Sequence, residues 1–242
     1  MQLTLPVHLP INQQFDSFIV GDNQLLISRL KSMLAGTAAS KELYKEPRQV
    51  FIHGGKGQGK SHLLYALCHF AESLGSQSFY LDLNQECKMP TSLLEGFGQT
   101  TILCIDDVHK IASHRPWQIA LFDLINQRME QQSGLTFFTS NSPPGKQDSH
   151  NSEDWLPDLV SRLSWGETYA IRPLNELNQI SLLTYLAGQK GMSFSGQTMS
   201  FILNHCERNT QSLVNIIERL DKRSMIEKKP LSINLVKREL NL

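Results

Sequence analysis

Gly54-Gly55-Lys56-Gly57-Gln58-Gly59-Lys60-Ser61 is the stretch that decides the fold of this 242-residue chain. It matches the pattern G-x-x-x-x-G-K-[ST], in which a glycine-rich loop joins a strand to a helix. A short apolar run at residues 50–53 precedes the motif, and a segment of helical period at residues 60–74 follows it. The motif therefore lies in the strand, loop and helix context that predicts a phosphate-binding loop.

The residue types in this loop fit the phosphates of a nucleotide. Glycines let backbone N–H groups turn toward phosphate oxygens, and the start of the helix adds its partial positive charge. We expect the Lys60 ammonium to reach the outer phosphates and the Ser61 hydroxyl to coordinate Mg²⁺. The residues of the loop expected to bind nucleotide are Gly54, Gly55, Gly57, Gln58, Gly59, Lys60 and Ser61.

Short apolar runs alternate with helical segments over the first two thirds of the chain. Strands are expected at residues 50–53, 79–83, 101–105, 135–139 and 168–171. Helices are expected between them, at residues 60–74 and 117–132. This alternation predicts right-handed crossovers and a mainly parallel sheet with helices on both faces, so the fold class is α/β.

After Pro173 the strand signals stop and the pattern becomes helical, with apolar residues at three- and four-residue spacing. Helices are expected at residues 176–188, 197–206, 211–226 and 233–240. The predicted organisation is a short N-terminal arm (1–13), an α/β nucleotide-binding domain (14–173) and a small all-helical domain (174–242).

Polar residues follow two of the expected strands. Asp106 and Asp107 come directly after the apolar run 101–105, as the acidic element of a phosphate-loop enzyme does. Asp106 is expected to hold Mg²⁺, directly or through a water. Asp107 is expected to orient an attacking water, although it is one methylene shorter than the glutamate that many such ATPases use. Asn141 closes the next strand, where it can meet a γ-phosphate or that water; an ordinary polar turn is the alternative.

Composition restricts the class of protein. The 23 basic and 23 acidic residues cancel to a formal charge of zero, which argues against broad binding to nucleic-acid phosphates. No apolar run approaches the roughly 18 residues of a membrane span, and the first ten residues lack the pattern of a signal peptide. We therefore expect a cytoplasmic protein with no membrane partner. The scattered cysteines and histidines predict free thiols and no transition-metal site.

The order of these motifs resembles the AAA+ ATPases, and within them the DnaA family of bacterial replication initiators. The resemblance covers roughly residues 14–242 and includes Leu156-Pro157-Asp158-Leu159-Val160-Ser161-Arg162-Leu163 ahead of the helical domain. It implies a five-stranded sheet of order 5-1-4-3-2 and a helical lid over the nucleotide. It also implies an adenine nucleotide (ADP or ATP) with Mg²⁺ as cofactors. Arg162 matches the box arginine that enters a neighbouring subunit's site.

Three more residues complete the expected nucleotide site, two of them placed there by the resemblance. Residues 15–23 look like the segment that opens the DnaA module beside the nucleotide base, which brings in Val20. His62, directly after the phosphate loop, is included with it. Gln211 stands where these proteins commonly carry a lid arginine that contacts phosphate. Because glutamine brings no charge, we expect weak or no ATPase activity of the chain's own.

Gln2-Leu3-Thr4-Leu5-Pro6 resembles the motif by which bacterial replication proteins enter the groove of the DNA polymerase III β sliding clamp. The Gln2 amide would anchor in a polar niche while Leu3 and Leu5 bury apolar surface, with Pro6 limiting the entropy lost. A disordered terminus is the alternative.

The chain ends where DnaA continues into its DNA-reading domain, and residues 85–99 are too few for the initiators' extra helix. No direct sequence-specific DNA binding is therefore expected.

The resemblance as a whole implies a regulator that binds nucleotide, docks on the clamp and presents Arg162 to ATP held by the initiator DnaA. Two other functions stay open: a stand-alone P-loop ATPase or kinase, which would turn over nucleotide without a partner, and an AAA+ helicase-loading adaptor. For Arg162 itself, an ion pair with Asp158 four residues earlier is the alternative. A homodimer or a larger homo-oligomer also stays open.

Overall fold

The computed structural model describes residues 9–39, 48–86, 88–132, 134–146, 155–207, 209–227 and 233–239. They divide into two compact units. The first comprises the described residues up to Phe18, together with Asn23–Gly55 and Lys60–Ile171. The second comprises Ile19–Asp22, Lys56–Gly59 and the described residues from Arg172 onward. The two units are described separately below.

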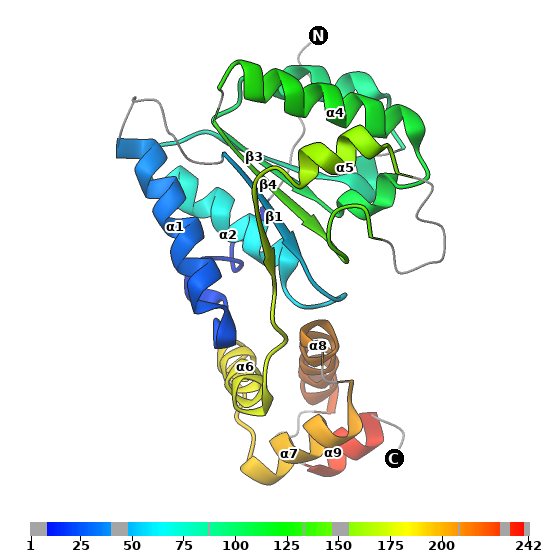
Figure 1. The fold of residues 1–242 in the computed structure, drawn as a ribbon. Coiled ribbons are helices and arrows are strands. Elements are labelled where there is room, and N and C mark those ends of the chain that lie inside the picture. The colour runs from blue at the N-terminus through cyan, green and yellow to red at the C-terminus, as the bar shows by residue number, and fades with distance from the viewer. Residues whose placement is uncertain are drawn as a thin grey trace. The chain divides into compact units, whose positions relative to one another are not determined.

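The first unit is built on a five-stranded sheet (Figure 1). Its strands are β1 (Gln49–His53), β2 (Ser78–Asp82), β3 (Ile102–Asp106), β4 (Leu135–Ser140) and β5 (Glu167–Ala170). Every pairing is parallel, and the order β2-β3-β4-β1-β5 is the expected order. Each strand begins and ends within one residue of its predicted bounds. The predicted fold class and strand order are therefore confirmed.

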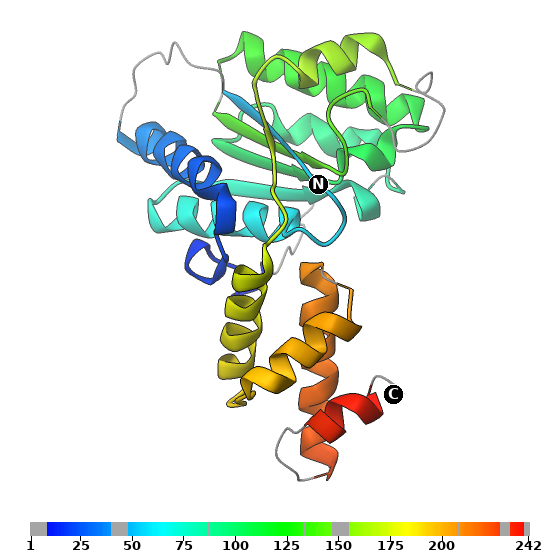
Figure 2. The same cartoon turned by 60° about the horizontal axis from the view of Figure 1, so that its bottom comes forward.

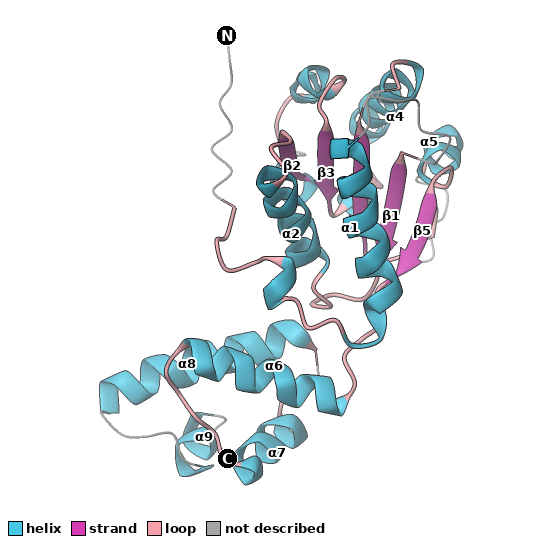
Figure 3. Ribbon diagram, turned by 90° about the vertical axis from the view of Figure 1, so that its left-hand side faces the viewer, coloured by secondary structure: helices cyan, strands magenta, loops and turns pink. Residues whose placement is uncertain are grey.

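Helices cover both faces of this sheet, which is why its central strands are buried along nearly their whole length. Figure 3 shows α1 (Gln24–Ala39) and α2 (Lys60–Ser73) on one face, and α4 (Arg115–Glu130) and α5 (Pro157–Leu163) on the other. The face toward α4 and α5 has a continuous apolar core to which the sheet contributes Phe51, Leu103 and Phe138. Among these helices, α1 was not predicted from the sequence.

The connection between β2 and β3 consists of a short helix, α3 (Leu83–Glu86), and a 3₁₀ segment, η3 (Thr91–Phe97). Leu94 and Phe97 of η3 are buried in the core toward α4. Buried Arg128 of α4 donates to the carbonyl oxygens of Phe97 and Thr100 at 2.8 and 3.0 Å. These contacts hold the connection flat against the domain.

The second unit is helical (Figure 2), with α6 (Glu176–Gln189), α7 (Gly196–His205), α8 (Thr210–Glu227) and α9 (Ile233–Glu239). Side-chain caps fix where two of these helices begin. Asn175 Oδ1 accepts from Asn178 N–H at 3.0 Å, and Ser195 Oγ accepts from Thr198 N–H at 3.2 Å. Apolar side chains from all four helices form one core, and the predicted C-terminal helices match the observed ones closely.

Within the described ranges, no helix is long and apolar enough to cross a membrane. Those ranges also contain no cluster of three or more histidine, cysteine or acidic side chains that could hold a metal ion. Cys68, Cys104 and Cys206 are free thiols, whereas Cys87 lies outside the described residues.

Candidate nucleotide-binding site

The phosphate loop joins the end of β1 to the start of α2. Gly57 and Gly59 have φ values of 74° and 89°, in the left-handed region that glycine adopts without strain. The first N–H groups of α2, including those of Ser61 and His62, have no partner within the helix, since hydrogen bonds in a helix reach back four residues. The loop therefore combines tight turns, free N–H donors and the positive end of a helix at one point.

Lys60 lies inside this loop with only 6% of its surface exposed. Its ammonium donates to the carbonyl oxygens of Gly54 and Gly55 at 2.8 and 3.0 Å, and to Asn141 Oδ1 at 2.9 Å. Burial lowers the pKa of Lys60, while the nearby carboxylates of Asp107 and Asp106 act to raise it. The ammonium is thus held among neutral oxygens, where a phosphate would find a concentrated positive charge.

Asp106, at the end of β3, is 2% exposed and fixed by both neighbouring strands. Its Oδ2 accepts from the Tyr80 hydroxyl of β2 at 2.7 Å, and its Oδ1 accepts from the Thr139 hydroxyl of β4. Burial, followed by the charge of Asp106, holds the pKa of Tyr80 far above its usual range, so this hydroxyl stays a donor. Sequence reasoning missed Tyr80 and Thr139. The residue pattern of β2 and β4 alone does not indicate that their hydroxyls contact Asp106.

Asp107 turns the chain out of the sheet. Its backbone is left-handed, with φ 55° and ψ 44°, and it precedes the 3₁₀ segment η4 (Val108–Ile111). Its N–H donates to Thr139 Oγ1 at 3.0 Å, which ties the turn to β4. Burial, and then the charge of Asp106, raises the pKa of the Asp107 carboxyl. A carboxylate held in this way gains proton affinity, as a group that orients or accepts a proton from water needs.

Asn141 follows β4 and joins the lysine to a histidine that the sequence analysis did not single out. Its Oδ1 accepts from Lys60, and its Nδ2 lies 2.9 Å from His109 Nε2. His109 Nδ1 in turn lies 3.8 Å from Asp107 Oδ1. The structure therefore brings together four polar residues from the loop and the ends of β3 and β4: Lys60, Asp106, Asp107 and Asn141, with His109 added.

These residues fit a phosphate group with Mg²⁺. The Asp106 carboxylate accepts from Tyr80, Thr139 and the N–H of Asp107, which leaves about one of its roughly four lone-pair positions for a water of the metal's shell. Ser61 directly follows the lysine and would provide the hydroxyl ligand. When bound, Mg²⁺ would neutralise part of the phosphate charge and fix the phosphate oxygens in place.

The three further residues of the expected nucleotide site, His62, Val20 and Gln211, lie in different settings. His62 Nε2 lies 3.1 Å from both Ser17 Oγ and the Gln14 carbonyl oxygen, and burial lowers its pKa. Its side chain is therefore occupied by the N-terminal segment. In the second unit, which includes Val20, a Cβ on Gly57 would lie 3.0 Å from Gln211 Cβ. Gln211 therefore lies beside the tip of the loop.

Arg162 lies on α5 and is held by α4. Its Nε donates to Asn126 Oδ1 at 2.6 Å, and its guanidinium lies 5.1 Å from the ring centre of Trp165 and 5.9 Å from that of Phe122. Trp165 is 62% exposed. In the part of the chain that the structure describes, no ion pair joins Arg162 to Asp158, so neutral and aromatic groups hold it instead.

The backbone shows where Arg162 stands relative to the phosphate loop. Its carbonyl oxygen accepts from Gln49 Nε2 at 2.8 Å, and Gln49 is the first residue of β1. The phosphate loop follows the last residue of β1, which at about 3.3 Å per residue is roughly 13 Å further along the strand. Arg162 and the loop therefore lie at opposite ends of β1.

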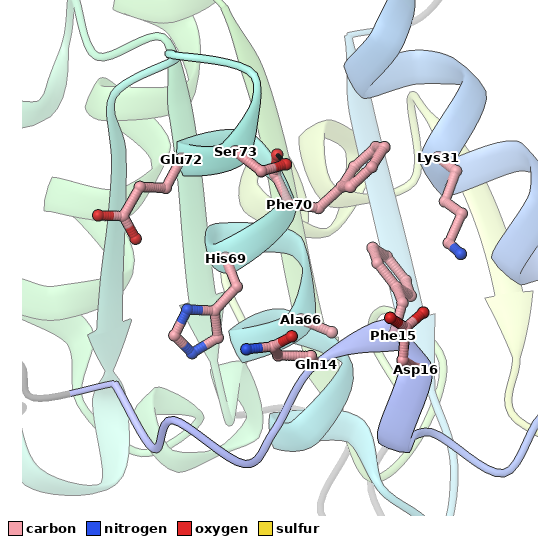
Figure 4. A pocket seen from close by; sticks show the side chains of 9 residues that line it. All are labelled: Gln14, Phe15, Asp16, Lys31, Ala66, His69, Phe70, Glu72 and Ser73. Carbon is pink, nitrogen blue, oxygen red and sulfur yellow. Dashed lines mark hydrogen bonds between the residues drawn. The ribbon is translucent and has the colours of Figure 1, made fainter.

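Gln2, Leu3, Leu5 and Pro6 lie outside the described residues. The described chain begins just after them, and its start is anchored on α2, where His69 Nε2 lies 3.1 Å from the Pro10 carbonyl oxygen. His69 also lines a pocket of about 520 Å³ between the N-terminal turn, α1 and α2 (Figure 4). The other residues lining it are Gln14, Phe15, Asp16, Lys31, Ala66, Phe70, Glu72 and Ser73.

A parallel sheet of this order, with a phosphate loop after β1, carboxylates after β3, a polar residue after β4 and a C-terminal helical unit, defines an AAA+ P-loop NTPase. Residues 9–170 match the family of bacterial DnaA ATPase domains, and residues 176–240 match the Hda lid domain. The chain belongs to the DnaA family and is an AAA+ protein related to replication initiation, close to Hda.

Solved structures show the same fold. Domain III of DnaA from Thermotoga maritima has 20% identity and a TM-score of 0.79, with 96% of this chain and 97% of that chain covered. DnaA from Aquifex aeolicus bound to AMPPCP has 20% identity and a TM-score of 0.73, covering 97% of this chain and 70% of that one. The Thermotoga maritima RuvB branch migration motor has 13% identity and a TM-score of 0.70, covering 96% and 72%.

Proposed function

We propose that this chain is a cytoplasmic AAA+ regulator of replication initiation. It binds an adenine nucleotide with Mg²⁺, docks on the DNA polymerase sliding clamp and promotes hydrolysis of ATP bound to DnaA, which inactivates the initiator. The observation that carries this proposal is the place of Arg162, which lies at the opposite end of β1 from the chain's own phosphate loop.

The setting of Arg162 supports action on a nucleotide that another protein holds. The backbone of Arg162 lies at the far end of β1, roughly 13 Å along the strand from the phosphate loop, so its guanidinium cannot reach the phosphates bound there. Asn126 and the two aromatic rings hold it without neutralising its charge, because none of them is anionic. It therefore stays available to an incoming phosphate, where a planar guanidinium stabilises the charge that spreads over the γ-phosphoryl group.

The chain's own site supports nucleotide binding more strongly than fast turnover. Its second carboxylate is the shorter aspartate, Asp107. Its lid position carries the neutral Gln211, whose amide donates to Asn215 Oδ1 at 2.9 Å. A site of this kind would hold nucleotide as a structural ligand that stabilises the fold by mass action.

The N-terminal arm supports the proposed docking on the clamp. Gln2, Leu3, Leu5 and Pro6 match the clamp-binding motif in sequence, and the described chain that follows them is attached to α2 at Pro10 through His69. Burying one leucine contributes roughly 1.5 to 3 kcal/mol, so removing Leu5 together with the Gln2 amide should weaken clamp binding about tenfold or more. A biosensor with immobilised clamp measures this, with Thr4→Ala in the same arm as the matched control.

The function is tested by single-turnover hydrolysis of ATP loaded on DnaA, with clamp on DNA and this protein added. We expect wild type to accelerate hydrolysis and Arg162→Ala to lose the acceleration, while it still binds nucleotide and clamp. Arg115→Ala, an exposed arginine of the same unit, should behave as wild type.

Three results would contradict the proposal. Acceleration by Arg162→Ala at the wild-type rate would remove the arginine from the mechanism. Rapid turnover by this chain alone would instead support a stand-alone ATPase. Capture of a hexameric helicase, with no effect on DnaA, would support a helicase-loading adaptor.

A further inference from the structure

His109 joins the polar groups at the end of β3 to those at the end of β4, although it belongs to neither strand. It lies in η4, where its neighbours Val108 and Ile111 are fully buried and fix the segment. Its own side chain keeps 19% exposure and faces both Asn141 and Asp107. The imidazole therefore stands between the Asn141 amide, which is expected to meet the γ-phosphate, and the Asp107 carboxylate, which is expected to orient the attacking water.

The directions of these hydrogen bonds follow from which atoms can donate. The Lys60 ammonium is only a donor, so the Asn141 atom at 2.9 Å from it must be the oxygen. The Asn141 nitrogen then faces His109 Nε2 at 2.9 Å, and because an amide nitrogen only donates, Nε2 must accept. A neutral imidazole that accepts at Nε2 carries its proton on Nδ1.

That proton faces Asp107. His109 Nδ1 lies 3.8 Å from Asp107 Oδ1, which is too long for a direct hydrogen bond but brings an N–H dipole toward a carboxylate. One chain of donors therefore runs from the Lys60 ammonium through the Asn141 amide and the His109 ring toward Asp107. The first two links are hydrogen bonds, which fix the Asn141 amide and the tautomer of His109, and the last is the approach of an N–H to the Asp107 carboxylate.

We propose that His109 is a positioning residue of the nucleotide site, one that holds the Asn141 amide and the Asp107 carboxylate in a single arrangement around the outermost phosphate. The inference rests on the proposed nucleotide function. Asn141 is the residue expected to meet the γ-phosphate, and its hydrogen bond to Lys60 places its amide beside the lysine that contacts the outer phosphates. His109 thus acts on the part of the site that a triphosphate fills and a diphosphate leaves open.

The chemistry that His109 supplies can be separated from its bulk. Glutamine offers an oxygen that can accept from Asn141 and an N–H that can face Asp107, so His109→Gln preserves the order of donors and acceptors. Leucine has a comparable size and no polar atom, so His109→Leu removes it. His114, exposed at the start of α4 and with no capping bond from its side chain, provides the matched control His114→Leu.

The test compares the affinities of AMPPCP and ADP by calorimetric titration in the presence of Mg²⁺. We expect His109→Leu to lose about fivefold in preference for AMPPCP over ADP, the size of one net hydrogen bond. His109→Gln should retain most of the preference, and His114→Leu all of it. Melting temperatures without nucleotide check the fold, and His109→Ala replaces the leucine variant if that variant does not fold.

An unchanged preference in His109→Leu would overturn the inference. Equal losses for both nucleotides would also overturn it, since a purely structural role weakens the whole site. If wild type bound neither nucleotide, the proposed nucleotide function would fail, and the inference with it. If wild type bound both nucleotides, and His109→Leu kept the wild-type preference for AMPPCP over ADP, the inference alone would fail.

Discussion

Lys60 and Arg162 are two cations of the same unit, held in opposite ways. Lys60 is buried at the carboxyl end of β1, and each of its three donors meets a protein oxygen. Arg162 is half-buried near the amino end of β1, with one neutral hydrogen-bond partner and two aromatic neighbours. The first arrangement forms a closed receptor for an anion inside the unit. The second leaves a charge without an anionic partner, which the proposed function assigns to a phosphate held by another protein.

The largest effect is expected when the guanidinium of Arg162 is replaced by an ammonium group like that of Lys60. We expect Arg162→Lys to lose stimulation of DnaA-bound ATP hydrolysis by about 10³-fold or more, the lower end of what an arginine supplied in trans contributes. An ammonium keeps the charge but cannot present the planar fork or stack on Trp165 as a guanidinium does. The measurement is the single-turnover rate at saturating protein. Wild-type stimulation by the lysine variant would show that charge alone suffices.

A smaller effect is expected when Lys60 is removed from the phosphate loop. Lys60→Ala removes the buried ammonium, so saturating nucleotide should stabilise wild type and barely stabilise the variant. At a ligand concentration of 100 times Kd, binding adds about 2.7 kcal/mol to the free energy of unfolding. For a chain of this size, that raises Tm by roughly 5 to 10 °C.

Lys56→Ala is the matched control for this measurement. Lys56 belongs to the same loop but is exposed, so its removal should leave the Tm shift close to that of wild type. Equal Tm shifts in wild type and Lys60→Ala would show that the ammonium does not contact the ligand. Lys60 would then not be the phosphate-binding cation to which Arg162 is compared.

The sequence predicted the surroundings of Lys60 better than those of Arg162. Each strand was placed within one residue, because short apolar runs bounded by turns leave little freedom, and the motif fixed Lys60 at the start of α2. Asp106, Asp107 and Asn141 follow strand ends, and parallel strands bring their carboxyl ends to one edge of the sheet. The pattern of residues along the chain thus contains most of this arrangement.

The partners of Arg162 could not be predicted in the same way. Local spacing indicated Asp158, four residues away, whereas the structure uses Asn126, which lies 36 residues away on another helix. Tyr80, Thr139 and His109 were missed for the same reason, because their contacts depend on which strands become neighbours in the sheet. Helix α1 was missed because Leu25, near its start, is 76% exposed, which obscures an amphipathic pattern.

The smallest expected effect concerns Asp107, where function and stability should oppose each other. Burial and the neighbouring Asp106 raise the pKa of Asp107, so its ionised form is less favourable in the folded chain than in the unfolded one. Asp107→Asn removes that charge, and asparagine also tolerates the left-handed backbone, with φ 55°. We expect a gain of under about 1 kcal/mol, or roughly 1 to 3 °C in Tm, at neutral pH.

The pH dependence gives this prediction its sign. Because the folded pKa is raised, the native state holds the proton more tightly, and the cost of ionised Asp107 develops as pH rises from about 3.9, the ordinary value, through the folded pKa. The advantage of Asp107→Asn should therefore be complete at pH 8 and shrink as pH falls toward 4.5. Calorimetric Tm values measure it, with Asp123→Asn as an exposed control on α4. An advantage that grew on acidification would mean that the Asp107 carboxylate stabilises the fold, and the site would then keep its charge at no cost in stability.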